Sequence, residues 1–290
     1  MKVLVTGGRG MIGRVVTNRL LRSGYAVVSA DRSLPDGRPP EPSEHQVVCD
    51  VTDAGEVWPL VAGQDAVVHL AGIPEAGTMP DAVVLETNVL GAYHVLSAAR
   101  ALGVRTVVQA SSATLLGFDG RTRPPVRYLP VDEKHPVATA NVYSLSKALS
   151  EDVARHTVGL SAALRIWSLR LTLVLGPENW EREGLPRLGD PERGMRHLFA
   201  YVWVDDVADA IERCLVADPG GVGHDAVFVS GPDVLAYEPG DRLRERFFPH
   251  IPWTGGPSFV CTDLARDLLD FVPRRSWRDA QAPRASGGEA

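Results

Sequence analysis

Lys2-Val3-Leu4-Val5-Thr6-Gly7-Gly8-Arg9-Gly10-Met11-Ile12-Gly13 is an apolar run, a glycine-rich turn and the beginning of an amphipathic segment. The pattern predicts a short buried strand followed by a tight turn and a helix that stops near Gly24. Glycines at such spacing let the backbone turn sharply and approach a pyrophosphate, while a helix amino terminus offers unpaired N–H groups to phosphate. We interpret the stretch as the opening of a dinucleotide-binding fold, with these residues against the cofactor: Gly7, Gly10, Met11, Ile12 and Gly13.

A second predicted strand, 26–31, ends in an acid, Asp31. A carboxylate at this place accepts hydrogen bonds from an adenosine ribose and repels a 2′-phosphate, which favours NAD over NADP. Arg9 and Arg32 give the opposite cue, because arginines suit phosphate well. They are alternatively solvated loop residues or stack on adenine. The acid is the stronger cue, so we expect NAD, with Asp31 and Arg32 beside the ribose.

Composition limits the classes of protein to which the chain can belong. It has 290 residues, 44% of them hydrophobic, so it can bury a large core. A net charge of −6 argues against a nucleic-acid partner. The three cysteines have no metal-ligand spacing, and we interpret them as reduced thiols in a cytoplasmic protein without a metal. No signal-peptide pattern and no long uninterrupted apolar run are present, so we expect no membrane span.

The next two strands are expected at 46–49 and 66–72. Asp50 follows the first of them and is placed to meet an adenine amino group, with Val51 beside it; an N-cap role for Asp50 or Asp53 is the alternative. The small residues at the end of the other strand allow a cofactor to lie close: Leu70, Ala71 and Gly72. His69 lies in an apolar strand, where a core histidine is expected rather than a catalytic one.

Strands and helices continue to alternate along the chain. Apolar spacing predicts a helix at 81–102, with Asn88 off its apolar face, and a strand at 106–110 that leads into Ser111-Ser112. This order predicts an α/β fold, a Rossmann-like doubly wound parallel sheet with a small interleaved substrate lobe. We expect the dinucleotide-binding domain at 1–177, with 201–230 returning to it, the lobe at 178–200 and 231–280, and a flexible tail at 281–290. Further elements are a strand within 164–175, a helix at 204–217, a strand at 226–230 and helices at 241–248 and 262–269.

The candidate catalytic groups lie in Tyr143-Ser144-Leu145-Ser146-Lys147, on a helix expected at 139–157. Residues four apart share one helix face, so the Tyr143 phenol and the Lys147 ammonium can point the same way. A phenol is a poor base near neutral pH, but the neighbouring ammonium and the positive nicotinamide of an oxidised cofactor both favour its phenolate form. Ser112, at the end of the adjacent strand, can then bind the substrate oxygen. Tyr-x-x-x-Lys on an ordinary surface helix is the alternative.

These motifs resemble the extended short-chain dehydrogenase/reductase superfamily, specifically the NAD-dependent epimerase/dehydratase family. The resemblance covers nearly the whole chain and includes the Leu169-Arg170-Leu171, Gly176-Pro177 and Val204-Asp205-Asp206-Val207 segments. It implies that Ser112 and Tyr143 serve as substrate-oxygen donor and acid/base, and that Lys147 holds the nicotinamide ribose. It also implies cofactor-side roles for Asn88 and Ser111, and a homodimer formed through the helices at 81–102 and 139–157.

The residues after Ser112 narrow the choice of reaction. Family dehydratases carry an Asp-Glu pair there, where this chain has Ala113-Thr114, so dehydration is disfavoured. Nucleotide-sugar epimerases usually have a longer insert than 178–204. Uronate dehydrogenases resemble the chain at 69–73 but differ at Pro74 and Ala113-Thr114. We therefore expect an oxidoreductase that moves hydride between NAD and a secondary alcohol or ketone of a small polyhydroxylated substrate. A sugar or nucleotide-sugar epimerase is the alternative, and a non-catalytic NAD(P)-binding regulatory protein is the third.

Overall fold

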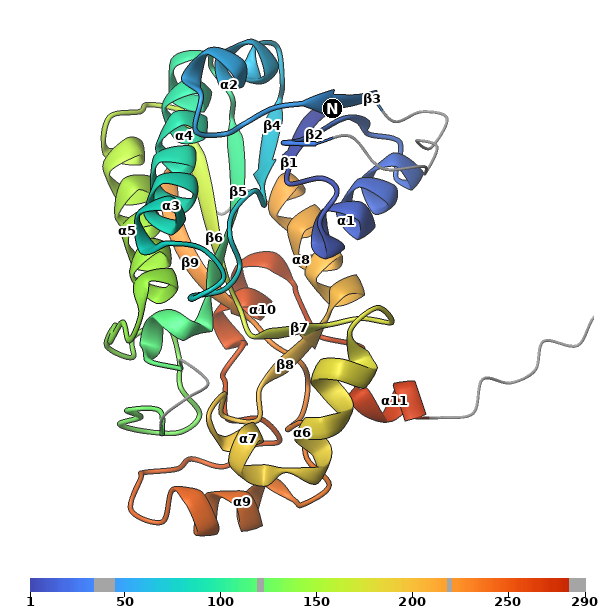
Figure 1. Cartoon of the computed structure of the whole chain (residues 1–290), viewed down its shortest axis with the longest axis vertical. Coiled ribbons are helices and arrows are strands. Elements are labelled where there is room, and N and C mark those ends of the chain that lie inside the picture. The colour runs from blue at the N-terminus through green and yellow to red at the C-terminus, as the bar shows by residue number, and fades with distance from the viewer. Residues whose placement is uncertain (34–44, 119–122, 218–220, 282–290) are drawn as a thin grey trace, which may run out of the picture.

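Seven parallel strands form one sheet in the part of the chain that the structure describes. The computed structural model describes residues 1–33, 45–118, 123–217 and 221–281 (Figure 1). The strand order is β3-β2-β1-β4-β5-β6-β9. It runs outward from β1 in both directions, so the topological switch point lies between β1 and β4. The strands are β1 (Lys2–Thr6), β2 (Ala26–Asp31), β3 (His45–Val48), β4 (Ala66–His69), β5 (Thr106–Ser112), β6 (Arg165–Leu171) and β9 (Gly223–Val229).

Helices cover both faces of this sheet (Figure 1). On one face, α2 (Ala54–Val61), α4 (Gly91–Ala101) and α5 (Val142–Gly159) share a buried cluster with Leu4 of β1. On the other face, α1 (Met11–Arg22), α8 (Val204–Val216) and α10 (Asp263–Leu269) share one with Val3 and Val5. Successive side chains of a strand point to opposite faces, so the apolar run of β1 is buried on both sides. The predicted doubly wound α/β fold is confirmed.

The helix predicted at 81–102 is not one regular α-helix. It consists of α3 (Asp81–Leu85), a π-helical turn η1 (Glu86–Leu90) and α4, and the backbone stays helical at both junctions. A π-turn widens the helix locally and changes the direction of its side chains. Asn88, expected away from the apolar face, is buried in this turn. Apolar periodicity gives no sign of such a turn.

The same segment, Asp81–Ala101, meets a length and composition test for a membrane-spanning helix. Its Val95, Leu96 and Ala99 side chains are buried in the core shared with α2 and α5. A core helix meets the same test, so the segment is weak evidence for a membrane.

Below the sheet in Figure 1, segments that are distant in sequence pack together. The strand predicted within 164–175 is split: β6 ends at Leu171, and β7 (Leu173–Leu175) pairs in parallel with β8 (Tyr201–Trp203) in a second sheet. The chain between β7 and β8, expected to be short and polar, folds into η3 (Trp180–Gly184), α6 (Leu185–Gly189) and α7 (Pro191–Met195). Buried aromatic side chains fill this region together with α9 (Gly240–Phe247): Phe199, Phe228, Phe247, Phe248 and Phe259.

The predicted boundaries of the remaining elements agree with the structure to within a few residues. Strand β9 begins at Gly223, ahead of the predicted 226–230, because it pairs with β6 from Arg165 onward. A last short helix, α11 (Trp277–Gln281), was not expected. Its Trp277 is buried beside Tyr201 and Leu235. Residues 282–290, which the tail prediction covers, lie outside the described part of the chain.

Candidate active site

The glycine loop connects the carboxyl end of β1 to α1. Gly7 has a φ of +69°, and a Cβ atom there would lie 2.6 Å from the backbone nitrogen of Ala71. A Cβ atom at Gly13 would lie 2.1 Å from the Gly7 carbonyl oxygen. Both collisions would be with backbone, which cannot move aside, so only glycine fits. Gly10 caps α1 without a side chain, and the first turn has no acid, which leaves the N–H groups of Met11, Ile12 and Gly13 for an anion. The loop fits a pyrophosphate.

Asp31 lies beside this loop at the end of β2. Its carboxylate accepts hydrogen bonds from the backbone nitrogens of Arg9 (3.1 Å) and Arg32 (2.8 Å). The Arg9 guanidinium donates to the Ser33 carbonyl oxygen, so this side chain lies across the end of β2 and is half-buried rather than solvated. Arg32 is exposed. The carboxylate and the Arg9 guanidinium therefore both lie at the end of β2.

Strand β4 ends against the opposite side of the loop. The Leu70 nitrogen donates to the Thr6 carbonyl oxygen (3.0 Å), and the Ala71 nitrogen donates to Thr6 Oγ1 (3.4 Å). His69 is buried, and its Nδ1 shares a hydrogen bond with the same hydroxyl (2.8 Å). Burial lowers the pKa of His69 to about 3, with the nearby Lys147 adding to the shift, so the ring is neutral. The prediction of a core histidine is confirmed.

Asp50 and Val51, which are predicted to lie on the adenine side of the cofactor, follow the end of β3. The Asp50 carboxylate accepts from the nitrogen (2.9 Å) and hydroxyl (2.8 Å) of Thr52, within its own turn. Val51 is buried against α4. The alternative cap role belongs to Asp53, which begins α2 by accepting from the Gly55 nitrogen (2.7 Å). Contact of Asp50 or Val51 with a cofactor stays a prediction.

Ser112, Tyr143 and Lys147 come together at the carboxyl end of β5. The Ser112 hydroxyl oxygen accepts from Thr114 Oγ1 (2.9 Å) and is hydrogen-bonded to the Tyr143 phenol. Lys147 is almost fully buried, and its Nζ donates to the Ala110 carbonyl oxygen (2.9 Å). This Nζ lies 5.7 Å from the centre of the Tyr143 ring. The structure thus brings the three predicted catalytic residues into one site.

A capping box fixes the start of the catalytic helix. The Asn141 side chain accepts from the Ser144 nitrogen (2.9 Å), and Ser144 Oγ accepts from the Asn141 nitrogen (3.1 Å). Such a pair satisfies two N–H groups that a helix start leaves free. Helix α5 therefore begins at Val142, later than the predicted residue 139, and the cap holds Tyr143 in the first turn.

Burial decides the protonation of the catalytic pair. It raises the pKa of Tyr143, and the hydrogen bond to Ser112 opposes this only in part. It also lowers the pKa of Lys147 to about 8. Among the groups of the chain itself, desolvation of the phenolate is the largest influence, while the predicted help from the positive nicotinamide of bound NAD stays a prediction. Tyr143 is thus protonated near neutral pH, and further positive charge is needed beside it before it acts as a base.

Asn88 supports the site through hydrogen bonds within the protein. Its side chain accepts from the Ile73 nitrogen (2.7 Å) and donates to the Ile73 carbonyl oxygen (3.0 Å) and to Ser146 Oγ (2.9 Å). It therefore ties the chain after β4 to the catalytic helix. The amide is used within the protein, and a cofactor-side role for Asn88 stays a prediction.

A buried ion pair beneath the site was not predicted from the sequence. Arg170 of β6 donates to both carboxylate oxygens of Glu151 on α5, at 3.0 and 2.8 Å. Ser111 Oγ donates to the same carboxylate (2.7 Å), so this hydroxyl is directed at Glu151, and only the backbone of Ser111 is left for a cofactor. Two features of the sequence could have indicated this ion pair. Arg170 is a charged residue inside the apolar strand 164–171, and Glu151 is an acid four residues after Lys147, on the same helix face.

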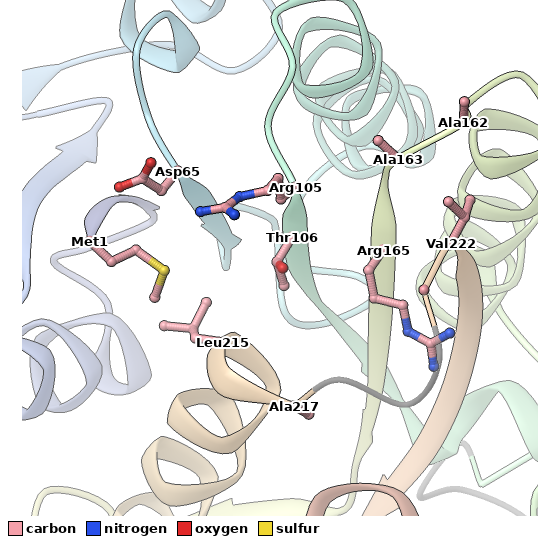
Figure 2. A pocket seen from close by; sticks show the side chains of 11 residues that line it. Met1, Asp65, Arg105, Thr106, Ala162, Ala163, Arg165, Leu215, Ala217 and Val222 are labelled. Atoms are coloured by element: carbon pink, nitrogen blue, oxygen red, sulfur yellow. The ribbon is translucent and has the colours of Figure 1, made fainter.

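A cavity of about 490 Å³ lies elsewhere in the molecule (Figure 2). It is lined by residues at the amino ends of β5 and β6 and by neighbouring segments, among them Asp65, Arg105 and Arg165. Ligands of open parallel sheets bind outside the carboxyl ends of the strands. Because Ser112 and the glycine loop lie at that carboxyl edge, this cavity is not the candidate active site.

The chemistry that the residues can perform is proton transfer at a substrate oxygen. Ser112 and Tyr143 provide two hydroxyls in one hydrogen-bonded chain, so one can bind the oxygen while the other gives or takes its proton. The buried Lys147 ammonium holds a positive charge beside them. Such a group of residues suits the interconversion of an alcohol and a carbonyl when a hydride carrier lies on the adjacent glycine loop.

Comparison with known proteins identifies the family. A model of the NAD dependent epimerase/dehydratase family matches residues 3–190. The uronate dehydrogenase of Pseudomonas putida is 31% identical over 229 residues, which cover 78% of this chain and 75% of that protein. The UDP-glucose 4-epimerase of Homo sapiens is 31% identical over 225 residues, or 69% of this chain and 60% of that protein.

The fold agrees with these sequence matches. A solved structure of a mutated uronate dehydrogenase superposes with a TM-score of 0.68 and 25% sequence identity, covering 99% of this chain and 88% of that one. The segment matched by the family model contains the glycine loop, Ser112, Tyr143 and Lys147. The chain is therefore an NAD-dependent enzyme, and it belongs to the NAD dependent epimerase/dehydratase family.

Proposed function

We propose that this enzyme transfers a hydride between NAD and a secondary alcohol or ketone of a small, sugar-like substrate, with net oxidation or reduction. Bound NAD supplies the hydride acceptor or donor. Ser112 binds the substrate oxygen, and Tyr143 moves its proton, assisted by the charge of Lys147. The observation that carries the proposal is the meeting of these three residues beside a glycine loop that accepts a pyrophosphate.

Substrate size is inferred from the segment between β7 and β8. It holds only η3, α6 and α7, and its Leu188 and Met195 are buried, so it is compact and well packed. We propose that this segment and 231–280 form a substrate lobe on the dinucleotide-binding domain, sized for a free sugar or sugar acid. The P. putida relative is a uronate dehydrogenase, which supports a small substrate.

Epimerisation is the second candidate, because a UDP-glucose 4-epimerase is about as similar in sequence. In that reaction the ketone stays bound and is reduced from its other face, so no NADH accumulates. The intact Ser112, Tyr143 and Lys147 argue against a purely regulatory NAD-binding protein, which would need only the binding half of the site.

A substrate panel distinguishes these functions. We expect NADH absorbance to rise with at least one free sugar, sugar acid or related hydroxy compound, and not with UDP-sugars. An enzyme that purifies with NAD retained and isomerises a UDP-sugar without releasing NADH would instead be an epimerase. Absence of turnover with every compound, combined with NAD binding, would support the regulatory function.

Cofactor choice is tested through Asp31. We expect NADH to bind at least about tenfold more tightly than NADPH, a difference of about 1.4 kcal/mol, because a 2′-phosphate would lie close to the carboxylate. Asp31→Ala should narrow or reverse this preference, since Arg9 and Arg32 would then face the phosphate alone. Fluorescence titration of both cofactors on both proteins measures the effect. Equal affinities in the wild type would show that the arginines outweigh the acid.

We also propose a homodimer in the cytoplasm. Four exposed apolar side chains lie on the helical segments for which the family resemblance implies an interface: Leu90, Tyr93, Leu145 and Leu149. Pairing α4 and α5 with those of a second copy would remove this apolar surface from water. The predicted cytoplasmic location rests on cysteine usage. Two of the three thiols, Cys49 and Cys214, are buried.

A further inference from the structure

A second hydroxyl lies against Ser112 at the end of β5. Thr114 Oγ1 donates to Ser112 Oγ at 2.9 Å, and the Thr114 backbone nitrogen donates to the same oxygen at 3.2 Å. The second bond caps a short 3₁₀-helical turn, η2 (Ala113–Leu116), which begins directly after Ser112. Thr114 therefore contacts the Ser112 hydroxyl oxygen twice, once through its side chain and once through its backbone.

Packing and backbone bonds hold this turn in place independently of the Thr114 hydroxyl. Leu115 and Leu116 are fully buried. The Thr114 carbonyl oxygen accepts from the nitrogen of Gly117 (2.9 Å), which ends the turn with a φ of +93°. Thr114 itself is half-buried. A substitution that removes only its hydroxyl should thus leave the turn folded.

The hydrogens and lone pairs at Ser112 determine the direction in which its hydroxyl bonds. A hydroxyl has one hydrogen to donate and two lone pairs that accept. Thr114 occupies both lone pairs of Ser112 Oγ, one with its side chain and one with its backbone nitrogen. The single hydrogen of Ser112 is left for a third group, which is the Tyr143 phenol here and the substrate oxygen in a complex.

The bonds from Thr114 thus give the two catalytic hydroxyls different roles. With both lone pairs occupied, Ser112 cannot accept the phenol proton, so it donates to the substrate oxygen while Tyr143 keeps its hydrogen for the same oxygen. The Lys147 ammonium, with Nζ 5.7 Å from the centre of the Tyr143 ring, favours the phenolate that remains after the proton has left. Without the Thr114 hydroxyl, one lone pair of Ser112 is free, and the phenol can donate to it instead.

We propose that Thr114 is a positioning residue, which keeps Ser112 a hydrogen-bond donor to the substrate oxygen and thereby leaves the transfer of the proton to Tyr143. In the direction of reduction, the carbonyl oxygen takes the phenol proton while the carbonyl carbon takes a hydride from bound NADH. Tyr143 is left as a phenolate and regains a proton from water, and Ser112 keeps its hydrogen throughout. Oxidation is the reverse. The proposal rests on the proposed oxidoreductase function and specifies how its two hydroxyls receive their roles.

The test compares wild-type enzyme with Thr114→Val, Thr114→Ser and the control Thr157→Val. Valine has nearly the shape of threonine without the hydroxyl, and serine restores the hydroxyl. The control removes a hydroxyl that donates to the Val153 carbonyl oxygen near the other end of α5. NADH absorbance gives kcat, KM and their pH dependence in the direction of alcohol oxidation. Ultraviolet titration of the phenolate with NAD bound, after subtraction of the matching Tyr143→Phe protein, follows Tyr143 without turnover.

We expect Thr114→Val to lower kcat about tenfold with a smaller change in KM, which is the effect of losing one hydrogen bond. The pH profile of kcat/KM and the phenolate titration should both move to higher pH. The reason is that the free lone pair of Ser112 accepts from the protonated phenol and so stabilises that form over the phenolate. Thr114→Ser should recover most of kcat, and Thr157→Val should behave as the wild type.

The two readouts separate this proposal from the function on which it rests. If the enzyme turns over and either kcat or the Tyr143 titration is unchanged in Thr114→Val, the role of Thr114 is overturned and the oxidoreductase function stands. A loss that Thr114→Ser does not recover has the same meaning, because it belongs to packing of the turn. A titration that shifts in Thr114→Val without turnover of any compound would support Thr114 and overturn the oxidoreductase function. Neither turnover nor a shift would overturn both.

Discussion

Tyr143→Phe is expected to lower kcat/KM by about 10²- to 10⁴-fold and to leave the affinity for NAD nearly unchanged. The substitution removes only the phenol oxygen, which is hydrogen-bonded to Ser112 and which we propose moves the substrate proton, while the ring keeps its packing. Steady-state kinetics with the substrate identified by the panel measures the first effect. NADH fluorescence titration measures the second.

Two further variants show whether the effect belongs to the Tyr143 phenol. Tyr93→Phe removes the same atom from an exposed tyrosine of α4 and should keep wild-type kinetics. Lys147→Ala should reduce both turnover and NAD affinity, because the resemblance to the family places this ammonium on the nicotinamide ribose as well as beside the phenol. Wild-type activity of Tyr143→Phe would refute the catalytic assignment.

The largest effect on stability is expected at the buried ion pair beneath the site. The Arg170 and Glu151 side chains are 7% and 2% exposed, and their N–O distance is 2.8 Å. Arg170→Met leaves the buried Glu151 carboxylate with only the half-exposed Arg155 at 3.9 Å, and loss of one partner of a buried pair typically costs about 3–5 kcal/mol. The midpoint of urea unfolding should fall accordingly. The double variant Arg170→Met with Glu151→Leu should recover part of the loss, because it removes the unpaired charge.

An exposed pair provides the control for this prediction. Arg266 and Asp263 on α10 lie 2.7 Å apart, with side chains 54% and 63% exposed. Arg266→Met should therefore change stability by no more than about 1 kcal/mol. Equal losses in Arg170→Met and Arg266→Met would mean that burial does not govern the contribution of these pairs.

Much of the site was predictable because the residues that build it lie in short, locally determined segments. The glycine loop follows from backbone requirements at Gly7 and Gly13, where any side chain would strike the backbone. Tyr143 and Lys147 share a face because of helix geometry, and Ser112 lies near them because the ends of parallel strands meet at one edge of the sheet. The resemblance drawn from these motifs was confirmed by the family match.

The features of the site that the sequence did not predict depend on interactions between distant segments. Burial raises the pKa of Tyr143, and the depth of burial of the phenol is not specified by its neighbours in sequence. The partners of Asn88, which are Ile73 and Ser146, lie in two other segments and could not be read from helix periodicity. The hydroxyl of Ser111 turns to Glu151, a partner forty residues away along the chain.

The sequence by itself determined the order of strands and helices, the glycine turn and the choice of candidate catalytic side chains, since each follows from a local pattern of apolar spacing, glycine or helix period. Only the tertiary structure decided that Arg170 pairs with Glu151 and that 178–200 folds into three short helical segments. The physical reason is that charge balance and burial are set by contacts between segments far apart in the chain. Those contacts exist only once the sheet has assembled and the segments around it have packed together.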